Sequence, residues 1–310
     1  MENPRVVVVG DLLYDLLAKV DGDVRLGTDT FTPIRAAGGG SGANAAAWLA
    51  SSGVQTQFVG RIGDDVFGDF LEADLREAGV RAHLARDPSQ ATGKVFVLVD
   101  GAGGRTMITD RGAVENLGPQ DIPISLFDGG HLHLVGYTFS GGSRREAAFE
   151  AVRLARAAGM TVSVDPSAVP MLEDVGPERF LAWTCGADLC FPNLEEGSLL
   201  AGTEDPDQIV EDMLAYYPVV VLKLGAQGAL YADAEGRRSR VPAARARVDD
   251  TTGAGDALCA GFLSAWLAGA APEEALRQGV GLAASAVEHV GGRPGEGGAL
   301  RKGGAPSGRE

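Results

Sequence analysis

A glycine-rich turn followed by an aspartate is the stretch whose residue types are best suited to chemistry. Residues 250–256 read Asp-Thr-Thr-Gly-Ala-Gly-Asp, and the apolar run after them predicts a helix. The first turn of a helix has backbone N–H groups without intrahelical acceptors and carries the positive end of the helix dipole. Gly253, Ala254 and Gly255 therefore predict an anion hole, and Asp256 beside it predicts a general base for a hydroxyl. The alternative is that Asp256 only caps the helix.

A second group of polar residues lies near the start of the chain. Asp11 and Asp15 follow a run of four valines that predicts a strand buried on both faces. Gly39, Gly40 and Asn44 come later, in a glycine-rich stretch that begins a helix. Ligands of open α/β sheets bind beyond the carboxyl ends of the strands, so these carboxylates and this amide predict contacts to ligand hydroxyls. The alternative for the two acids is a pair of loop carboxylates in water.

The composition restricts the class of protein. The chain has 310 residues and a net charge of −15, which argues against nucleic-acid binding because lysine and arginine carry that affinity. Its three cysteines lack metal-ligand spacing and predict buried thiols in a reducing cytoplasm. The N-terminus lacks the apolar run of a signal peptide, and no stretch approaches the length of a membrane span. We therefore expect a cytoplasmic protein that binds neither nucleic acid nor membrane.

Strands and helices alternate along most of the chain. This alternation predicts a doubly wound, mostly parallel α/β sheet with helices on both faces. The predicted strands of this sheet are 6–9, 56–60, 131–137, 161–164, 187–191, 219–224 and 229–232, the last one antiparallel. The predicted helices include 66–78, 144–158, 209–216 and 273–289.

Two other segments predict a small β-sheet that is inserted into the α/β body. The first contains the predicted strands 16–20 and 30–35, and the second contains a hairpin of 92–100 and 105–109 around a glycine-rich turn. We expect these strands to form a lid. The predicted division is an α/β body of residues 1–15, 38–91 and 111–295, a lid of residues 16–37 and 92–110, and a mobile tail of residues 296–310.

The two glycine-rich helix starts can face the carboxyl edge of one sheet. Hydroxyl-holding groups at one start and an anion hole with a base at the other suit phosphoryl transfer from a nucleotide to a polyol. The Walker A pattern and the His-Arg-Asp loop of protein kinases are both absent. Two alternatives stay open: an NAD(P)-dependent oxidoreductase, although the first strand-to-helix turn lacks its glycine fingerprint, and a non-catalytic sensor of a sugar or nucleotide.

The chain resembles the ribokinase (PfkB) carbohydrate kinase family over about residues 5–295. Residues 250–262, Asp-Thr-Thr-Gly-Ala-Gly-Asp-Ala-Leu-Cys-Ala-Gly-Phe, are similar to the C-terminal signature of the family. Residues 39–44, Gly-Gly-Ser-Gly-Ala-Asn, and residues 60–65 are similar to its N-terminal signature. The resemblance implies ATP- and Mg²⁺-dependent phosphorylation of a sugar or nucleoside hydroxyl, with K⁺ as an activator in some members, and a homodimer formed through the lid. It leaves the acceptor open among ribose, fructose, a keto-deoxy sugar acid and a nucleoside such as adenosine.

The resemblance also implies roles for individual residues. Asp256 would be the catalytic base, and Gly253, Ala254 and Gly255 the anion hole. The residues that would contact the sugar are Asp15, Gly39, Gly40 and Asn44, with Asp11 nearby. Mg²⁺ and its waters near the phosphates would be organised by Asn193 and Glu196. The nucleotide would be flanked by Lys223, Gly225 and Gly228, and K⁺ would be held with the help of Asp250 and Thr252. Arg111, on the lid side, is the one cation near this edge of the predicted sheet. It favours an acidic sugar as the acceptor, unless it only pairs with Asp110.

The chain departs from the family pattern at three places. Ser41 stands where ribokinase itself tends to have lysine, so ribose is not implied. Lys223 stands where ribokinases more often have threonine. Residues 284–297 match the end of the family loosely, which weakens the implied K⁺ site and adenine contacts.

Overall fold

A nine-stranded sheet forms the centre of the molecule. The structure, a computed structural model, describes residues 4–20, 22, 24, 27–100 and 104–294. The strand order is β13-β12-β11-β10-β9-β8-β1-β4-β5, and pairing is parallel except where β12 pairs with β11 and β13. The strands are β1 (Arg5–Val9), β4 (Gln55–Gly63), β5 (Arg81–Asp87), β8 (His131–Val135), β9 (Thr161–Asp165), β10 (Leu189–Cys190), β11 (Val219–Lys223), β12 (Ala229–Asp233) and β13 (Arg238–Val241).

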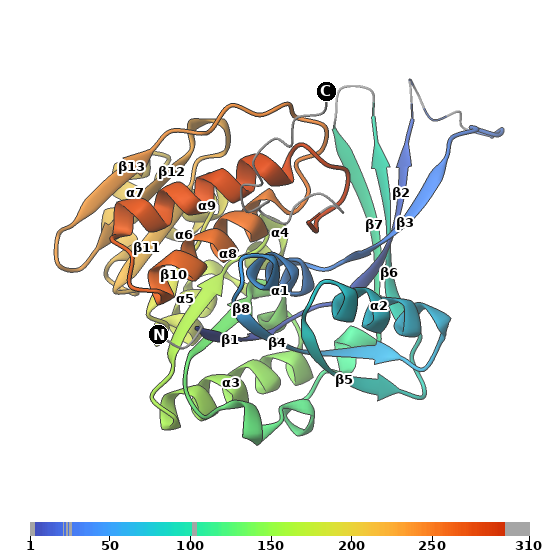
Figure 1. The fold of residues 1–310 in the computed structure, drawn as a ribbon, viewed down its shortest axis with the longest axis horizontal. Coiled ribbons are helices and arrows are strands. Elements are labelled where there is room, and N and C mark those ends of the chain that lie inside the picture. The colour runs from blue at the N-terminus through green and yellow to red at the C-terminus, as the bar shows by residue number, and fades with distance from the viewer. Residues whose placement is uncertain (1–3, 21, 23, 25–26, 101–103, 295–310) are drawn as a thin grey trace, which may run out of the picture.

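Helices cover both faces of this sheet (Figure 1). Val6 and Val8 of β1 pack with α1, α2, α8 and α9, whereas Val7 and Val9 pack with α3 to α7. A strand covered on both sides is apolar at every position, which explains the valine run. The helices are α1 (Ser41–Ser51), α2 (Val66–Glu77), α3 (Gly142–Ala157), α4 (Val169–Val175), α5 (Pro177–Thr184), α6 (Leu194–Ala201), α7 (Pro206–Met213), α8 (Ala254–Leu267) and α9 (Pro272–Ala286). Short 3₁₀ helices span Ala113–Asn116, Pro119–Asp121, Ile124–Leu126, Gly136–Phe139 and Gly225–Gln227.

A second sheet of four strands stands beside the body, at the right of Figure 1. Its order is β3-β2-β6-β7, with β2 and β6 parallel and the two outer pairs antiparallel. The strands are β2 (Leu13–Lys19), β3 (Ile34–Gly39), β6 (Thr92–Val99) and β7 (Arg105–Gly112). Val95 and Val97 are buried on its inner face, whereas Phe96 and Ile108, opposite each other on β6 and β7, are exposed on its outer face.

The predicted fold class is confirmed, including the small additional β-sheet. Several boundaries differ from the prediction. Strand β2 begins at Leu13 rather than residue 16, so Asp15 lies inside a strand of the small sheet, where it pairs across from Ala37 of β3. Apolar and polar residues alternate only weakly along β2, so the sequence pattern does not show where the strand begins. The hydrogen bonds that define the strand come from its partner strands. Helices α4 and α5 and strand β13 were not predicted.

Two further predictions concern the ends and the surroundings of the chain. The expected mobile tail, residues 296–310, lies outside the described residues. Among the residues that the structure describes, no helix has the length and apolar character that crossing a membrane requires.

The carboxyl end of β1 and the start of α1 approach each other through two glycines. A Cβ added at Gly10 would lie 2.9 Å from the Cα of Gly42, and one added at Gly42 would lie 2.8 Å from the Cα of Gly10. Real Cβ atoms do not approach this closely. The Gly42 N–H also donates to Oδ1 of Asp11 at 3.1 Å. The close approach therefore brings the helix start and Asp11 together at the end of β1.

Candidate active site

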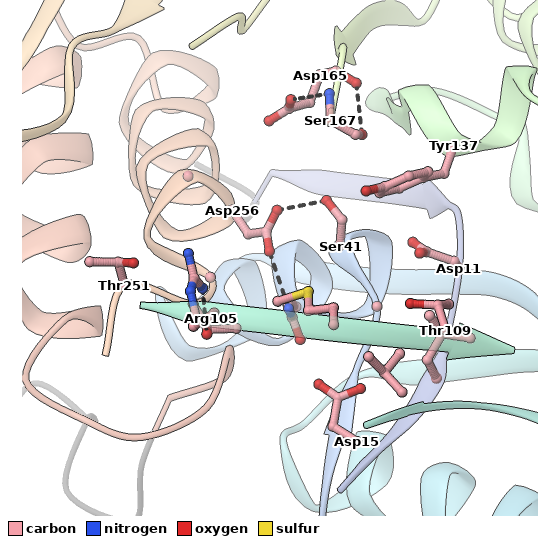
Figure 2. A pocket seen from close by; sticks show the side chains of 18 of the residues that line it. Asp11, Asp15, Ser41, Arg105, Thr109, Tyr137, Asp165, Ser167, Thr251 and Asp256 are labelled. Atoms are coloured by element: carbon pink, nitrogen blue, oxygen red, sulfur yellow. Dashed lines mark hydrogen bonds between the residues drawn. The ribbon is translucent and has the colours of Figure 1, made fainter. Parts of the chain in front are cut away.

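Asp256 lies in the first turn of α8 and faces a cavity of about 420 Å³ between the body and the small sheet. Ser41 Oγ donates a hydrogen bond to its Oδ1 at 2.7 Å, and Asn44 Nδ2 donates to its Oδ2 at 3.2 Å (Figure 2). Gly253 adopts a positive φ of 74° immediately before the helix, in the left-handed region that favours glycine. The N-terminus of α8 thus presents its backbone N–H groups and one carboxylate to the same cavity.

The environment of Asp256 changes its proton affinity. Burial raises the pKa of its carboxyl group to about 7, with a smaller upward contribution from Asp165, while the hydrogen bond from Ser41 lowers it. A general base works best when its pKa lies close to the operating pH. The N-cap of α8 is Gly253, so Asp256 lies within the helix, and its side chain accepts hydrogen bonds from Ser41 and Asn44 of α1. Asp256 is therefore not the N-cap of α8, which was the alternative.

Two further carboxylates line the cavity on the side of the small sheet. Asp11 follows β1, and Asp15 lies on β2; both are buried. Burial raises the pKa of Asp15 to about 7, Arg293 acts in the opposite direction, and Asp11 raises the pKa further. Among the described residues, Oδ1 of Asp15 has no hydrogen-bond partner. A buried carboxylate oxygen of this kind can accept a hydrogen bond from a ligand hydroxyl.

Arg111, near the end of β7, closes the same side of the cavity. Its guanidinium lies 4.3 Å from the centre of the Tyr137 ring and 4.0 Å from Oδ2 of Asp11. Its Nη1 is buried and has no hydrogen-bond partner among the described residues. Its partner is not Asp110, which was the alternative: the nearest acids are Asp11 and Glu115. Stacking on Tyr137 fixes the plane of the guanidinium while leaving donors for a ligand.

Lys223 brings a positive charge to the other side of the cavity. It ends β11, and its Nζ donates to Oδ2 of Asp165 at 2.6 Å. A Cβ added at Gly255 would lie 3.4 Å from this Nζ, so the ammonium group is next to the start of α8. Although burial acts to lower it, the pKa of Lys223 is raised by Asp165, by Cys259 and by Glu196. A permanent positive charge thus adjoins the predicted anion hole.

Asn193 and Glu196 form a reciprocal cap at the start of α6. The Asn193 backbone N–H and Nδ2 donate to the two carboxylate oxygens of Glu196, at 2.8 and 2.7 Å, and the Glu196 N–H donates to Oδ1 of Asn193 at 2.8 Å. Burial raises the pKa of Glu196, and Lys223 opposes this shift. Both residues line the cavity, so the cap also presents carboxylate lone pairs to it.

The residues fit a Mg²⁺ ion that arrives with a nucleotide. The described residues contain no group of three or more His, Cys, Asp or Glu side chains that would hold a metal. Mg²⁺ in phosphate-transferring enzymes usually has only one or two protein carboxylates, and waters and substrate phosphates complete its shell. Glu196 and Asp165, both buried carboxylates on the cavity wall, match that donor set.

Asp250 and Thr252 lie at the edge of the cavity, where a residue of the small sheet meets them. Oδ1 of Asp250 accepts from the Thr252 N–H and Oγ1, and Oδ2 accepts from the Gly291 N–H at 2.9 Å. Arg105 of β7 donates to Oγ1 of Thr252 at 2.6 Å, and its Nη1 lies 3.8 Å from Oδ1 of Asp250. The guanidinium of Arg105 therefore already supplies positive charge beside Asp250 and Thr252. For this reason the two residues fit a K⁺ ion poorly.

The structure gathers most of the sequence-predicted site residues around one cavity. Those that line it are Asp11, Asp15, Gly40, Asn44, Arg111, Asn193, Glu196, Lys223, Gly225, Thr252, Gly253, Gly255 and Asp256. Gly39, Gly228, Asp250 and Ala254 are not among the lining residues. Gly228 closes a turn with Gly225, and a Cβ there would lie 2.0 Å from the Val241 carbonyl oxygen, so its position is fixed by packing.

Asp165, Tyr137 and Arg105 are among the lining residues that were not predicted as parts of the site. Asp165 ends β9 and Tyr137 follows β8, so both stand at carboxyl ends of strands. That placement is the signal that had singled out Asp11. Arg105 offered no comparable signal, because only the packing of β7 against the body brings it to Thr252.

Comparison with known proteins agrees with this geometry. The model of the family described as pfkB family carbohydrate kinase matches residues 3–296. The chain is 32% identical to a fructokinase of Klebsiella pneumoniae over 92% of this chain and 94% of the relative. It is 32% identical to an ATP-dependent ribose-1-phosphate kinase of Halopiger xanaduensis over 88% of each chain. Among solved structures, the adenosine kinase of Sinorhizobium meliloti superposes with a TM-score of 0.85 at 26% identity, covering 94% of this chain and 96% of that one.

The family model and the relatives match nearly the full length of the chain, and all of them are phosphotransferases. They set aside the dinucleotide-dependent oxidoreductase and the non-catalytic sensor. The resemblance that the two signatures indicated is confirmed. The chain belongs to the pfkB family of carbohydrate kinases and is an ATP-dependent kinase that acts on a hydroxyl of a sugar or nucleoside.

Proposed function

We propose that Asp256 is the general base that activates the acceptor hydroxyl. The observation that supports this role is its placement: a buried carboxylate, held by Ser41 and Asn44, stands at the N-terminus of α8 in the cavity that Asp11 and Asp15 also line. Asp256 accepts the hydroxyl proton as the oxygen bonds to the γ-phosphorus. The bond from that phosphorus to the bridging oxygen breaks, and ADP leaves.

The groups around Asp256 have complementary roles in this proposal. The backbone N–H groups of Gly253, Ala254, Gly255 and Asp256 stabilise the charge on the moving phosphoryl group. The ammonium of Lys223 adds to that field, since it adjoins Gly255. Asn193, Glu196 and Gly225 line the cavity; the first two would hold Mg²⁺ through its waters, and Gly225 would border the nucleotide. Bound Mg²⁺ supplies further neutralisation of phosphate charge. Gly228 and Ala254 do not line the cavity and contribute through the backbone conformation of their segments.

The acceptor side of the cavity suits a small polyhydroxylated molecule. Asp11, Asp15 and Asn44 offer carboxylate and amide oxygens to its hydroxyls, and Gly40 allows its close approach to the backbone. Gly39 leaves room for the carboxylate of Asp15, because a Cβ there would lie 2.1 Å from its Oδ2. The small sheet of β2, β3, β6 and β7 forms the lid over it. The sugar is the first candidate because relatives include a fructokinase, and a nucleoside is the second because the similar structures include an adenosine kinase. Of the three free cysteines, Cys190 and Cys259 are buried as expected, whereas Cys185 is exposed. Free thiols fit the reducing cytoplasm that we propose as the compartment of the protein.

A coupled ADP-release assay tests this proposal. The wild type is assayed with ATP and Mg²⁺ against D-fructose, D-ribose, ribose 1-phosphate, 2-dehydro-3-deoxygluconate and adenosine. With the best of these acceptors, Asp256→Asn should lose roughly 10²–10⁴-fold in kcat, because the base is gone and the cavity shape is kept. Asp174→Asn, an exposed aspartate of α4, is the matched control and should keep full activity. A near-wild-type kcat for Asp256→Asn would remove the base from this mechanism.

A further inference from the structure

The C-terminal segment after α9 carries a buried arginine, Arg293, that lies behind the acceptor side of the cavity. Its side chain is 10% exposed and forms an ion pair with Asp74 of α2. Its Nη2 lies 3.4 Å from the carbonyl oxygen of Gly39, to which it donates. Burial lowers the pKa of Arg293 to about 10, which still leaves the guanidinium charged at neutral pH. No feature of the sequence indicated that this residue belongs near the site.

Two glycines at the end of β3 separate Arg293 from Asp15. A Cβ added at Gly38 would lie 2.3 Å from both Nη1 of Arg293 and Oδ2 of Asp74. A Cβ added at Gly39 would lie 2.1 Å from Oδ2 of Asp15. Successive residues of a strand point to opposite faces. The guanidinium and the carboxylate therefore approach the same strand from its two sides, with only backbone between them.

The segment that carries Arg293 is fixed at two other points. The Gly291 N–H donates to Asp250 at 2.9 Å, and the Trp48 Nε1–H donates to the carbonyl oxygen of Gly292 at 3.0 Å. These bonds connect the segment to the loop before α8 and to α1. Arg293 is therefore held behind β3 by contacts to elements that also carry Asp256 and Asn44.

We propose that Arg293 is a positioning residue whose charge keeps Asp15 ionised, so that its carboxylate accepts hydrogen bonds from the hydroxyls of the acceptor. This inference rests on the proposed function. The charged groups that bear on Asp15 are Asp11 after β1 and Arg293, with Asp74 as the counter-charge of Arg293 and Arg111 as that of Asp11. Burial and Asp11 both favour the protonated acid, and Arg293 alone of these groups directly opposes them.

The test is the pH dependence of KM for the best acceptor of the panel above. In the wild type, KM should rise as the pH falls through the pKa of Asp15, which is about 7. In Arg293→Gln, the rise should begin roughly one pH unit higher, because the variant removes the opposite charge that lowers the pKa of Asp15. The kcat at saturating acceptor should stay the same. Arg293→Lys should restore most of the wild-type profile, and Arg277→Gln, an exposed arginine of α9, should not alter it.

A second variant moves the profile in the other direction. Asp74→Asn removes the counter-charge of Arg293, so the field at Asp15 becomes more positive and the rise in KM should begin at a lower pH. Asp74 is one-third exposed, so this variant also covers the case in which Arg293→Gln does not fold. Coincident KM profiles for the wild type, Arg293→Gln and Asp74→Asn would overturn the inference.

A stability measurement separates this inference from the proposed function. Urea unfolding of the wild type, Asp15→Asn, Arg293→Gln and the double variant gives the coupling free energy between the two positions. The coupling should appear only above the pKa of Asp15, because only the ionised acid attracts the guanidinium. A wild type without activity on any acceptor would reject the proposed function, and this cycle would still decide the inference. A coupling that is equal at low and high pH would contradict it.

Discussion

Lys223 and Asp165 form a buried ion pair on the wall of the cavity, with Nζ 2.6 Å from Oδ2. Cys259 Sγ of α8 donates to the same carboxylate oxygen at 3.2 Å. The pair connects the ends of β9 and β11 to the helix that carries Asp256. Each charge offsets most of the free-energy cost of burying the other. The stability of the body therefore depends on both charges of this pair.

Removing one member of this pair should destabilise the protein strongly. Lys223→Met leaves the Asp165 carboxylate buried without its counter-charge, and such losses cost about 3–5 kcal/mol. Urea unfolding at pH 7 measures the change. The double variant Lys223→Met/Asp165→Asn should recover a large part of the loss, since neither charge is then left alone. An additive double variant would show that the two residues are independent.

The proton affinity of Asp256 predicts the pH dependence of the reaction. Its pKa is raised to about 7, and the base acts only when ionised, so kcat/KM should fall as the pH decreases below about 7. Asp15 has its pKa raised to the same value, so the decrease should be steeper than one proton per unit of pH. Asp15→Asn should reduce the slope to that of one proton. An acid limb near the ordinary aspartate pKa would contradict the assigned environment.

Arg111 should select between charged and neutral acceptors. Its buried Nη1, which has no hydrogen-bond partner in the described part of the chain, can bind an anionic substituent, and stacking on Tyr137 holds it in place. In Arg111→Gln, kcat/KM for 2-dehydro-3-deoxygluconate or ribose 1-phosphate should fall at least tenfold more than that for D-fructose, since a charge-assisted hydrogen bond is worth about 1.5–3 kcal/mol. Equal losses for all three acceptors would indicate that Arg111 supports the lid rather than the ligand.

Arg105 should make the enzyme insensitive to monovalent cations. Its guanidinium lies 3.8 Å from Asp250 and donates to Thr252, so it supplies the charge that K⁺ would bring. Wild-type activity should be equal in KCl and in choline chloride at constant ionic strength. Arg105→Ala should lose activity in choline and regain part of it in KCl. A wild type that already requires K⁺ would show that the cation binds elsewhere or displaces the arginine.

The outer face of the small sheet should form a homodimer contact. Ile34 of β3, Phe96 of β6 and Ile108 of β7 are exposed there, and Phe96 and Ile108 lie opposite each other on adjacent strands. Apolar sheet surfaces of this kind are usually covered by a partner. Light scattering after size-exclusion chromatography should give a dimer for the wild type and a monomer for Ile108→Lys. Ile124→Lys, at an exposed isoleucine elsewhere, should remain dimeric, and a monomeric wild type would exclude this contact.

The sequence indicated the body of the fold and the two polypeptide segments that meet at Asp256. The reason is local: a valine run, a glycine turn and an apolar helix each leave a pattern within a few residues. Arg293 and Arg105 were not identified, since their positions near the site depend on contacts between segments far apart in the sequence. Asp165 carried the same signal as Asp11, a carboxylate at the carboxyl end of a strand, but that signal was not applied to it. Asp15 was identified, but its place on a strand of the small sheet was not, because edge-paired strands have a weak pattern.

The paired glycines at positions 10 and 42 restrict how the enzyme can acquire a new acceptor. Neither position accepts a side chain, so the approach of β1 to α1, which brings Asp11 to the start of α1, cannot change. The walls that can vary are on β6 and β7, where Val95, Val97, Met107 and Thr109 line the cavity. Divergence among such kinases should therefore accumulate on these two strands, and a library confined to them is the direct route to an altered substrate range.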